Sequence, residues 1–369
     1  MNGGAFVSPP TWSFQHGLYI QQTRKRWRNN KRLSRNKYYL RCQVANIHKK
    51  SIVEKLANWL VETPLIVPLW YGARKMMTDT AENLGIKWRE EVKQLAQSRT
   101  DWEEVLRSVC NQNISIPRYY STKGDFFKGG VSFHGYPAGN LCWEAAFEQH
   151  LASQAVGARN FEEAGILGEQ VFRGKYASFL LQHVSEKLLQ SPHCSILDVG
   201  CGTGTSSVDL KQIFPRAKIT GIDLSPYMIA VARHRFASYD IEFLHDLAEA
   251  TQMQDESFDL VSMCLLIHEL PYEATKAVFR EAYRVLKEDG YLAIFEMDPS
   301  WEGNRKLRQM PIVFTLMRST EPYLEEYFYR VAPCVKELLE EAGFHFIHRQ
   351  QGLSKRGHLA LIAQKKKKE

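Results

Sequence analysis

The 369-residue sequence lacks any apolar run long enough to cross a membrane. A transmembrane helix needs about 20 predominantly apolar residues. The nearest candidate, from Trp59 to Tyr71, is interrupted by Glu62, Pro64 and Pro68. The sequence therefore predicts no transmembrane segment and leaves only peripheral contact with a membrane open.

Paired cysteines are also lacking. The seven cysteines form no C-x-x-C motif, and their number is odd. Structural zinc sites and disulfide frameworks depend on such pairs, so the pattern argues against both and indicates a reducing compartment. We therefore predict no metal site from the sequence.

Acidic residues are absent from the first 53 residues, which contain 11 Lys and Arg. This segment has no apolar periodicity and no continuous hydrophobic stretch typical of a secretory signal. Its start, from Phe6 to Pro10, and the stretch 40–45 resemble a plastid transit peptide with its processing region. We predict an organelle leader over residues 1–50 and a location in the chloroplast stroma, with a mitochondrial location as the alternative.

The net charge of +7 is concentrated at the two ends of the chain. Residues 365–369 form a basic tail, whereas residues 54–364 hold 33 basic and 40 acidic residues. Nucleic-acid binding rests largely on Lys and Arg contacts to phosphate. The excess of acidic residues over 54–364 therefore argues against a nucleic-acid partner. The sequence leaves the oligomeric state open.

The N-terminal part, residues 51–160, is predicted to be a helical extension. Helical periodicity indicates helices beginning at Ser51 and lying near 72–84, 88–95 and 101–110. Residues 112–140 are rich in Gly, Pro and aromatic side chains, which predicts an irregular loop. A further helix is expected over 141–158.

From Ser195 onward, predicted strands alternate with helices, which is typical of a doubly wound α/β sheet. The predicted strands are 195–200, 218–223, 241–245, 258–266, 291–297, 345–350 and 358–364, and the predicted helices are 174–189, 205–213, 226–237, 272–286 and 333–342. Residues 299–330 are too long for a simple connection, so we predict an inserted lid. The second predicted domain is 161–364.

The first predicted strand runs into a glycine-rich turn over 200–204. Glycine permits a sharp turn and a close approach to a ligand, and the following helix N-terminus presents free N–H groups. On the next strand, Asp223 can accept hydrogen bonds from a ribose diol. Residues 202–207 also nearly fit the dinucleotide pattern G-x-G-x-x-G/A, so a nicotinamide-dependent oxidoreductase stays open at this point.

Three companion segments follow the turn in order, at 221–224, 258–261 and 284–292. The set resembles the class I S-adenosylmethionine-dependent methyltransferase family, in its small-molecule branch with the type-11 motif, over residues 170–300. The resemblance implies a Rossmann-like, mostly parallel seven-stranded sheet whose last two strands form an antiparallel hairpin. The flanks at 140–146, 267–271 and 319–327 resemble methyltransferase-like proteins of cyanobacteria and plastids.

The resemblance implies S-adenosylmethionine as the cofactor. Asp198 and the turn 200–204 would hold its methionine end, and Asp223 its ribose hydroxyls. The family usually places an Asp before Ala-Glu near the adenine; this chain has Leu247 there, and Asp246 one position earlier. The predicted cofactor-binding residues are Asp198, Gly200, Cys201, Gly202, Gly204, Asp223, Leu224, Asp246, Leu247, Ala248 and Cys264.

The segment after the fourth predicted strand contains His268 and Glu269, the predicted catalytic residues. Methyl transfer needs positioning and, when the nucleophile carries a proton, a general base. Histidine titrates in the suitable range, and Glu269 would orient it or act itself; the alternative is that His268 caps the strand end. No Asn/Asp-Pro-Pro-aromatic tetrad is present here, which argues against methylation of nucleobase or glutamine nitrogen.

The aromatic loop 119–136 and the lid 299–330 are predicted to roof the pocket. The candidate substrate contacts are Tyr119, Tyr120, Trp143 and Tyr323. We therefore predict a methyltransferase acting on an oxygen or carbon of a small, apolar or aromatic molecule such as a quinone, phenol or isoprenoid. The alternatives are a non-catalytic S-adenosylmethionine-binding scaffold and, more remotely, an NAD-dependent oxidoreductase.

Overall fold

The computed structural model describes residues 56, 59, 63, 66–120, 133–136 and 138–366. From Lys50 to Glu369 the chain forms one compact unit. The predicted leader over 1–50 and the start of the predicted first helix at Ser51 lie outside the described residues. Within the described ranges, no helix is both long and apolar enough to cross a bilayer.

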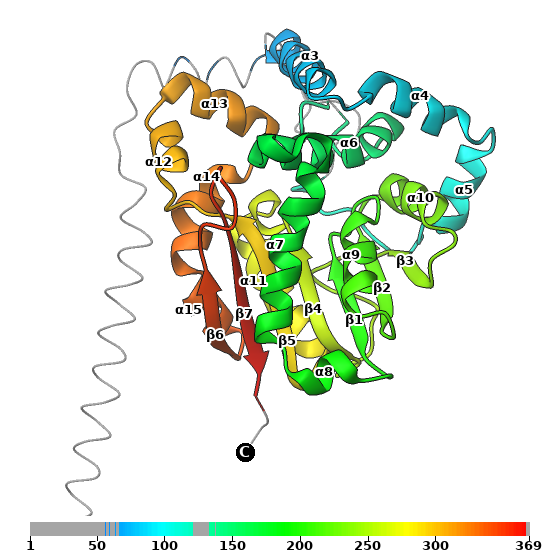
Figure 1. Cartoon of the computed structure of the whole chain (residues 1–369), viewed down its shortest axis with the longest axis vertical. Helices are drawn as coiled ribbons and strands as arrows, with labels where there is room; N and C mark the ends of the chain where they lie inside the picture. The colour runs from blue at the N-terminus through cyan, green and yellow to red at the C-terminus, as the bar shows by residue number, and fades with distance from the viewer. Residues whose placement is uncertain are drawn as a thin grey trace, which may run out of the picture. The chain divides into compact units, whose positions relative to one another are not determined.

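A seven-stranded sheet forms the centre of this unit (Figure 1). The strands are β1 Ser195–Val199, β2 Lys218–Asp223, β3 Ile241–His245, β4 Phe258–Cys264, β5 Leu286–Met297, β6 Phe344–Gln350 and β7 His358–Lys365. Their order is β3-β2-β1-β4-β5-β7-β6, with β1 to β5 parallel and β7 antiparallel to both neighbours. The predicted fold class is thereby confirmed. The antiparallel β7 also distinguishes the sheet from the six-stranded dinucleotide-binding arrangement, so the fold argues against the oxidoreductase alternative.

Helices cover both faces of the sheet. The helices are α3 Val67–Asn83, α4 Trp88–Gln97, α5 Trp102–Val109, α6 Trp143–Asn160, α7 Gly168–His183, α8 Glu186–Gln190, α9 Thr205–Ile213, α10 Pro226–Arg235, α11 Tyr272–Val285, α12 Glu302–Arg308, α13 Pro311–Thr320, α14 Leu324–Glu326 and α15 Val335–Glu341. Alternate residues of β1 point to opposite faces: Leu197 and Val199 join a core that contains α11 and α15, and Ile196 joins one that contains α7 and α9. Parallel strands that are covered on both faces in this way are almost entirely buried.

Backbone conformation explains where the observed elements differ from the predicted ones. β4 ends two residues early because Leu265 has a φ of 56°, outside the range of a strand. The predicted helix 174–189 is two helices, since it begins at Gly168 and is interrupted at Ser185, whose hydroxyl accepts from the Leu188 amide and caps α8.

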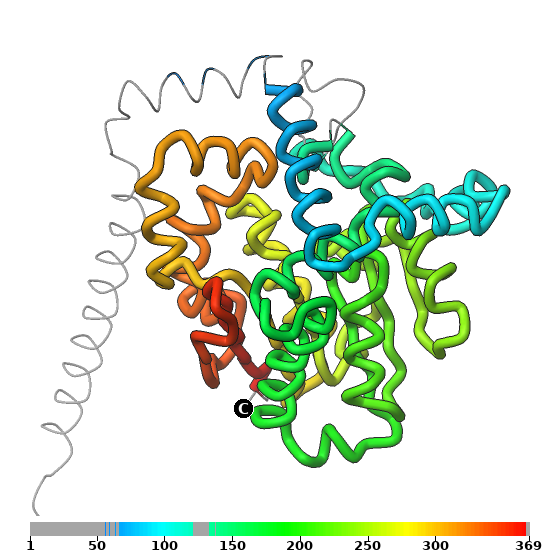
Figure 2. The backbone as a smooth tube through the Cα atoms, turned by 45° about the horizontal axis from the view of Figure 1, so that its top comes forward, coloured from blue at the N-terminus to red at the C-terminus, as the bar shows by residue number. Residues whose placement is uncertain are grey.

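The predicted lid, 299–330, contains α12, α13 and α14. In Figure 2 the first described helix, α3, lies beside α13, although the two are far apart in the sequence. The Trp70 indole of α3 donates to the Ser319 hydroxyl of α13 at 3.0 Å. The N-terminal helix α4 packs on α6, and α5 packs on α10. The N-terminal region therefore packs directly against helices of the sheet region.

The cysteines of the described residues include both free thiols and a disulfide-bonded residue. Cys110, Cys142, Cys194, Cys201 and Cys264 carry free thiols. Cys334 is disulfide-bonded, which the cysteine spacing did not predict.

Two glycines let α6 and α7 approach each other closely. A Cβ built on Gly157 would lie 2.2 Å from Glu169 Cα, and one on Gly168 would lie 2.6 Å from Ala158 Cα. Both neighbours are backbone atoms, which cannot swing aside as a side chain can. The crossing therefore depends on the missing side chains.

We expect Gly157→Ala to lower the free energy of unfolding by about 1–3 kcal/mol because the added methyl overpacks the crossing. Gly174→Ala is the matched control, since Gly174 lies in α7 and a Cβ added there would have nothing within 4 Å. This control should gain about 0.5–1 kcal/mol from helix propensity. Urea unfolding measures both; equal effects of the two changes would contradict the close-approach argument.

Candidate active site

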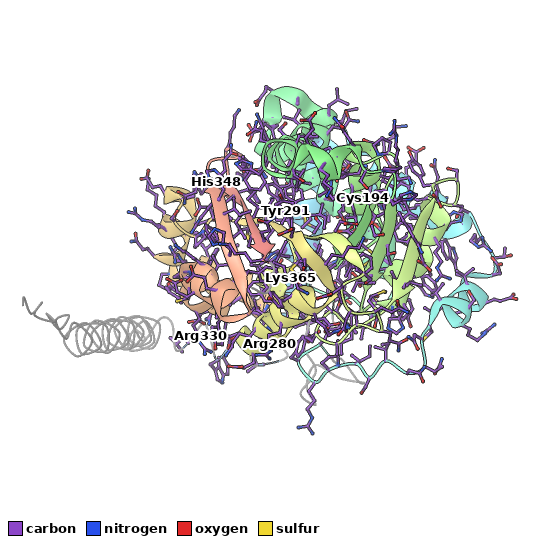
Figure 3. All side chains as sticks on the ribbon, turned by 90° about the horizontal axis from the view of Figure 1, so that it is seen from below. Cys194, Arg280, Tyr291, Arg330, His348 and Lys365 are labelled. Carbon is purple, nitrogen blue, oxygen red and sulfur yellow. The ribbon has the colours of Figure 1, made fainter. Side chains whose placement is uncertain are left out.

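A cavity of about 450 Å³ opens at the edge of the sheet where the parallel strands end. Ligand-binding clefts of α/β sheets lie at this edge. Figure 3 looks onto the opposite edge, where Cys194, Tyr291 and Lys365 lie. The cavity wall includes Gly200, Cys201, Gly202, Asp223, Leu224, Asp246, Ala248, Cys264, His268, Glu269, Tyr119 and Tyr120, which are twelve of the predicted site residues.

The glycine turn forms the floor of the cavity at the end of β1. Gly200, Gly202 and Gly204 have φ values of 70°, 54° and 89°, a left-handed region that side chains disfavour. A Cβ on Gly200 would lie 2.7 Å from Leu266, and one on Gly202 would lie 3.1 Å from the Gln149 amide. The turn therefore needs glycine both for its backbone shape and for the space beside it, which fits a ligand held close to the backbone.

Asp223, at the end of β2, braces this turn from the cavity wall. Its Oδ2 accepts from the Gly202 amide at 2.9 Å, and its Oδ1 accepts from the Ser225 amide at 2.8 Å. Burial raises the pKa of Asp223 to about 6. Each carboxylate oxygen keeps a further lone pair, so the group can accept hydroxyl donors from a ribose while it holds the turn.

Three predicted cofactor residues are not part of the cavity wall. Asp198 is completely buried behind the turn, where the hydroxyls of Ser206 and Ser207 donate to its Oδ2 at 2.6 and 2.7 Å. Gly204 packs against Phe243 and Phe236, and Leu247 is absent from the wall. These residues shape the turn and its neighbourhood from outside the cavity.

On the side of β3, Asp246 and Ala248 border the cavity, whereas Leu247 between them does not. The Asp246 carboxylate accepts from the amides of Leu247 and Gln252 at 2.8 and 3.0 Å. Of the two positions considered for the adenine side, Asp246 is therefore the one that faces the cavity.

Sequence reasoning missed two polar side chains beside the turn. Gln149 of α6 accepts from the Thr203 hydroxyl at 2.5 Å. Arg173 of α7 lines the cavity and is paired with Glu169 and Asp209. It is a candidate partner for the carboxylate of a bound amino-acid moiety.

His268 lies on a short 3-10 turn, Ile267–Glu269, after β4. Its Nδ1 donates to Glu296 at the end of β5, with distances of 2.8 and 3.0 Å to the two carboxylate oxygens. Burial alone lowers the pKa of His268, but Glu296, with Glu321 and Glu269, raises it to about 9. The expectation that Glu269 orients His268 is wrong: Glu296 holds the ring, and its Nε2 is left to face the other acidic groups.

Glu269 lies beside a second histidine that the sequence reasoning missed. His134 Nε2 is 3.4 Å from Glu269 Oε1 and 3.2 Å from Glu321 Oε1. All three residues border the cavity. Burial raises the pKa of Glu269. Burial also acts to raise the pKa of Glu321, but the charge of His134 outweighs this effect and holds the pKa of Glu321 below its usual range.

Of the four predicted substrate contacts, two line the cavity and two do not. Tyr119 and Tyr120 line the cavity, and the Tyr119 hydroxyl donates to Glu249. Tyr323 lies one layer behind, where its hydroxyl donates to the Tyr119 carbonyl at 2.7 Å. Trp143 is placed elsewhere: it stacks on Phe147 and its indole donates to Glu103, because the N-terminus of α6 turns it toward α5.

Comparisons with known proteins identify relatives of this chain. A family model described as a methyltransferase domain matches residues 196–290. A demethylmenaquinone methyltransferase of Listeria monocytogenes is 31% identical over 169 residues, which cover 42% of this chain and 70% of that protein. One of Chlorobaculum tepidum is 36% identical over 119 residues, but the chain spans only 46% of its length. A solved SAM-dependent methyltransferase of Methanosarcina mazei aligns with 52% of this chain and 98% of its own, at 21% identity and a TM-score of 0.39.

The sheet topology and the glycine turn beside Asp223 define a protein that binds a nucleoside-containing cofactor. The chain belongs to the class I S-adenosylmethionine-dependent methyltransferases. The cofactor of this family is S-adenosylmethionine, and the residues present fit it: a glycine cradle for close backbone approach, an acidic acceptor for the ribose, and Arg173 for the carboxylate.

We expect Asp223→Asn to weaken binding of S-adenosylmethionine by about 10–100-fold, because a charged acceptor contributes about 1.5–3 kcal/mol per hydrogen bond. Asp240→Asn is the control, since the Asp240 side chain is 97% exposed at the end of the neighbouring connection. Isothermal titration calorimetry measures the dissociation constants, and thermal unfolding verifies that both variants fold. Normal binding by Asp223→Asn would show that the ribose lies elsewhere.

Proposed function

We propose that the protein transfers a methyl group from S-adenosylmethionine to an oxygen or carbon of a small, apolar or aromatic acceptor. The observation that carries this proposal is that one cavity contains both the cofactor residues and a buried His–Glu pair. Gly200 and Asp223 form one part of its wall, and His268, held by Glu296, forms another.

When bound, S-adenosylmethionine supplies a methyl group on a positively charged sulfur. The protein residues position the acceptor in line with that methyl and exclude water from the closed end of the cavity. The neutral form of His268, which is the minor form near pH 7 because the pKa is raised to about 9, would accept the acceptor's proton at Nε2, and Glu296 would stabilise the resulting imidazolium through Nδ1. Gly200, Gly202 and Asp223 would hold the cofactor, which would supply the methyl group and leave as S-adenosylhomocysteine.

The walls around the acceptor end support an apolar substrate. Met77, Met317 and Leu324 line the cavity together with Tyr119 and Tyr120. Outside it, α3 and α13 expose large apolar side chains: Leu69, Tyr71, Met76, Met310, Ile312, Val313 and Leu316. These two helices also contribute Trp70 and Met317 to the wall.

The names of the relatives agree with this class of acceptor. Both sequence relatives described above are demethylmenaquinone methyltransferases. A reduced quinone is an apolar ring with ionisable hydroxyl groups, which needs the apolar wall and the proton acceptor described above. We therefore place quinols and simple phenols first among the acceptors to be tested.

We expect His268→Gln to lower kcat for methyl transfer by about 10²–10⁴-fold, the contribution typical of a general base. The dissociation constant of S-adenosylmethionine should stay within about twofold. Glu296→Gln should lower kcat less, and Glu296→Asp should recover part of the loss because it restores the charge. His345→Gln, at an exposed position of β6, is the control.

Production of S-adenosylhomocysteine in the presence of demethylmenaquinols and phenols measures this activity. An unchanged kcat in His268→Gln would contradict the role of this residue as a base. A wild-type protein that binds the cofactor but turns over no acceptor would favour the scaffold alternative.

We also propose a plastid location, which rests on the basic, acid-free composition of residues 1–50. A fusion of these residues to a fluorescent protein should enter chloroplasts in plant cells. Import into mitochondria instead would contradict the proposal.

A further inference from the structure

Three potential metal ligands from distant parts of the chain meet at the acceptor end of the cavity. His134 follows the aromatic loop, Glu269 follows β4, and Glu321 ends α13. One ligand atom of each lies within 4.8 Å of the ligand atoms of the other two. They are the only such group among the residues that the structure describes.

The distances between these atoms match those that a metal ion imposes. Ligands about 2.0–2.2 Å from a divalent cation lie about 3.0–3.5 Å apart in octahedral or tetrahedral geometry. His134 Nε2 is 3.2 Å from Glu321 Oε1 and 3.4 Å from Glu269 Oε1. The two pairs that include His134 therefore already have the spacing of metal ligands, and the ligand atoms of Glu269 and Glu321 lie within 4.8 Å of each other.

His134 is oriented as metal-binding histidines usually are. Its Nδ1 lies 3.1 Å from Asn140 Oδ1 and donates to it, which directs the lone pair of Nε2 toward the two carboxylates. Its backbone has a φ of 52°, unusual for a residue with a side chain, and its amide donates to the Thr320 carbonyl at 2.7 Å. Backbone strain of this kind clusters at functional sites.

Glu321 provides an independent indication that this cluster can accept a further ligand. Its Oε2 is buried and has no hydrogen-bond partner. A buried carboxylate oxygen without a partner is costly, because it has lost its water without a replacement. His268 Nε2 lies 4.0 Å from this oxygen.

We propose that His134, Glu269 and Glu321 bind a divalent metal ion that holds the acceptor. Three protein ligands leave coordination positions open, as in catalytic metal sites. One imidazole and two carboxylates suit Mn²⁺, Mg²⁺ or Zn²⁺. Resting on the proposed function, the inference names the acceptor class more closely: a molecule with two neighbouring oxygens, such as a catechol or hydroxyquinol, which chelates the ion beside His268.

The competing explanation is a set of ion pairs in which a protonated His134 lies between two carboxylates. The two explanations differ in what added metal does. The ion pairs exclude a cation from the cluster, whereas the metal site binds one ion per chain and loses it when any of the three ligands is removed.

The test uses the full-length chain, freed of metal with a chelator, and titration with MnCl₂ followed by electron paramagnetic resonance of free Mn²⁺. We expect one bound Mn²⁺ per chain. Glu321→Gln and His134→Asn should each weaken binding by at least about 10–100-fold. Glu302→Gln, a 67% exposed carboxylate of the lid, is the matched control.

Absence of Mn²⁺ binding, or binding that the ligand variants leave unchanged, would overturn the metal site. Thermal unfolding and S-adenosylmethionine affinity are measured on the same variants, and both should be preserved. The two proposals can be contradicted independently. If the protein binds the cofactor but no metal, only the metal site is contradicted. If it binds metal but transfers no methyl group, only the proposed function is contradicted. If both hold, Mn²⁺ should lower the KM of catechol more than that of phenol.

Discussion

The acceptor end of the cavity depends on one buried charge, the carboxylate of Glu296. The residue is completely buried at the end of β5, yet it accepts from the His268 backbone amide at 3.2 Å, from the His268 ring, and from the Met297 amide at 2.8 Å. A buried carboxylate is tolerated only when it is paired and hydrogen-bonded. Because the His268 amide and ring both lie on the segment after β4, the same interactions that stabilise the charge also fix the position of His268 and its neighbour Glu269.

The sheet and the cofactor side of the site could be predicted from the sequence because their signals are local. Apolar strands alternate with helices, and the glycine turn between β1 and α9 carries its conformational requirement in its own residues. Asp223 follows on the next strand, and parallel strands bring their carboxyl ends to one edge. The sequence could not predict that Asp198 lies behind the turn, since burial depends on which side of the chain the cavity forms.

The acceptor side could not be predicted in the same way. His134 and Glu321 lie in segments without periodicity, and only the contact of residues 133–136 with the end of α13 brings them together. Trp143 looked like a roof residue because it follows the aromatic loop, but the direction of α6 decides where it points. Glu296 did leave a signal, a single acidic residue in the apolar run of β5, and a charge in a buried strand is itself evidence of a partner.

The antiparallel β7 has a practical consequence. Because it runs against β5, its last residue, Lys365, lies at the edge of the sheet where the parallel strands begin, away from the cavity. A fusion partner or surface linkage attached beyond this strand would therefore leave the cavity mouth free. The protein can be immobilised through that end for acceptor screening with its active site open to the solution.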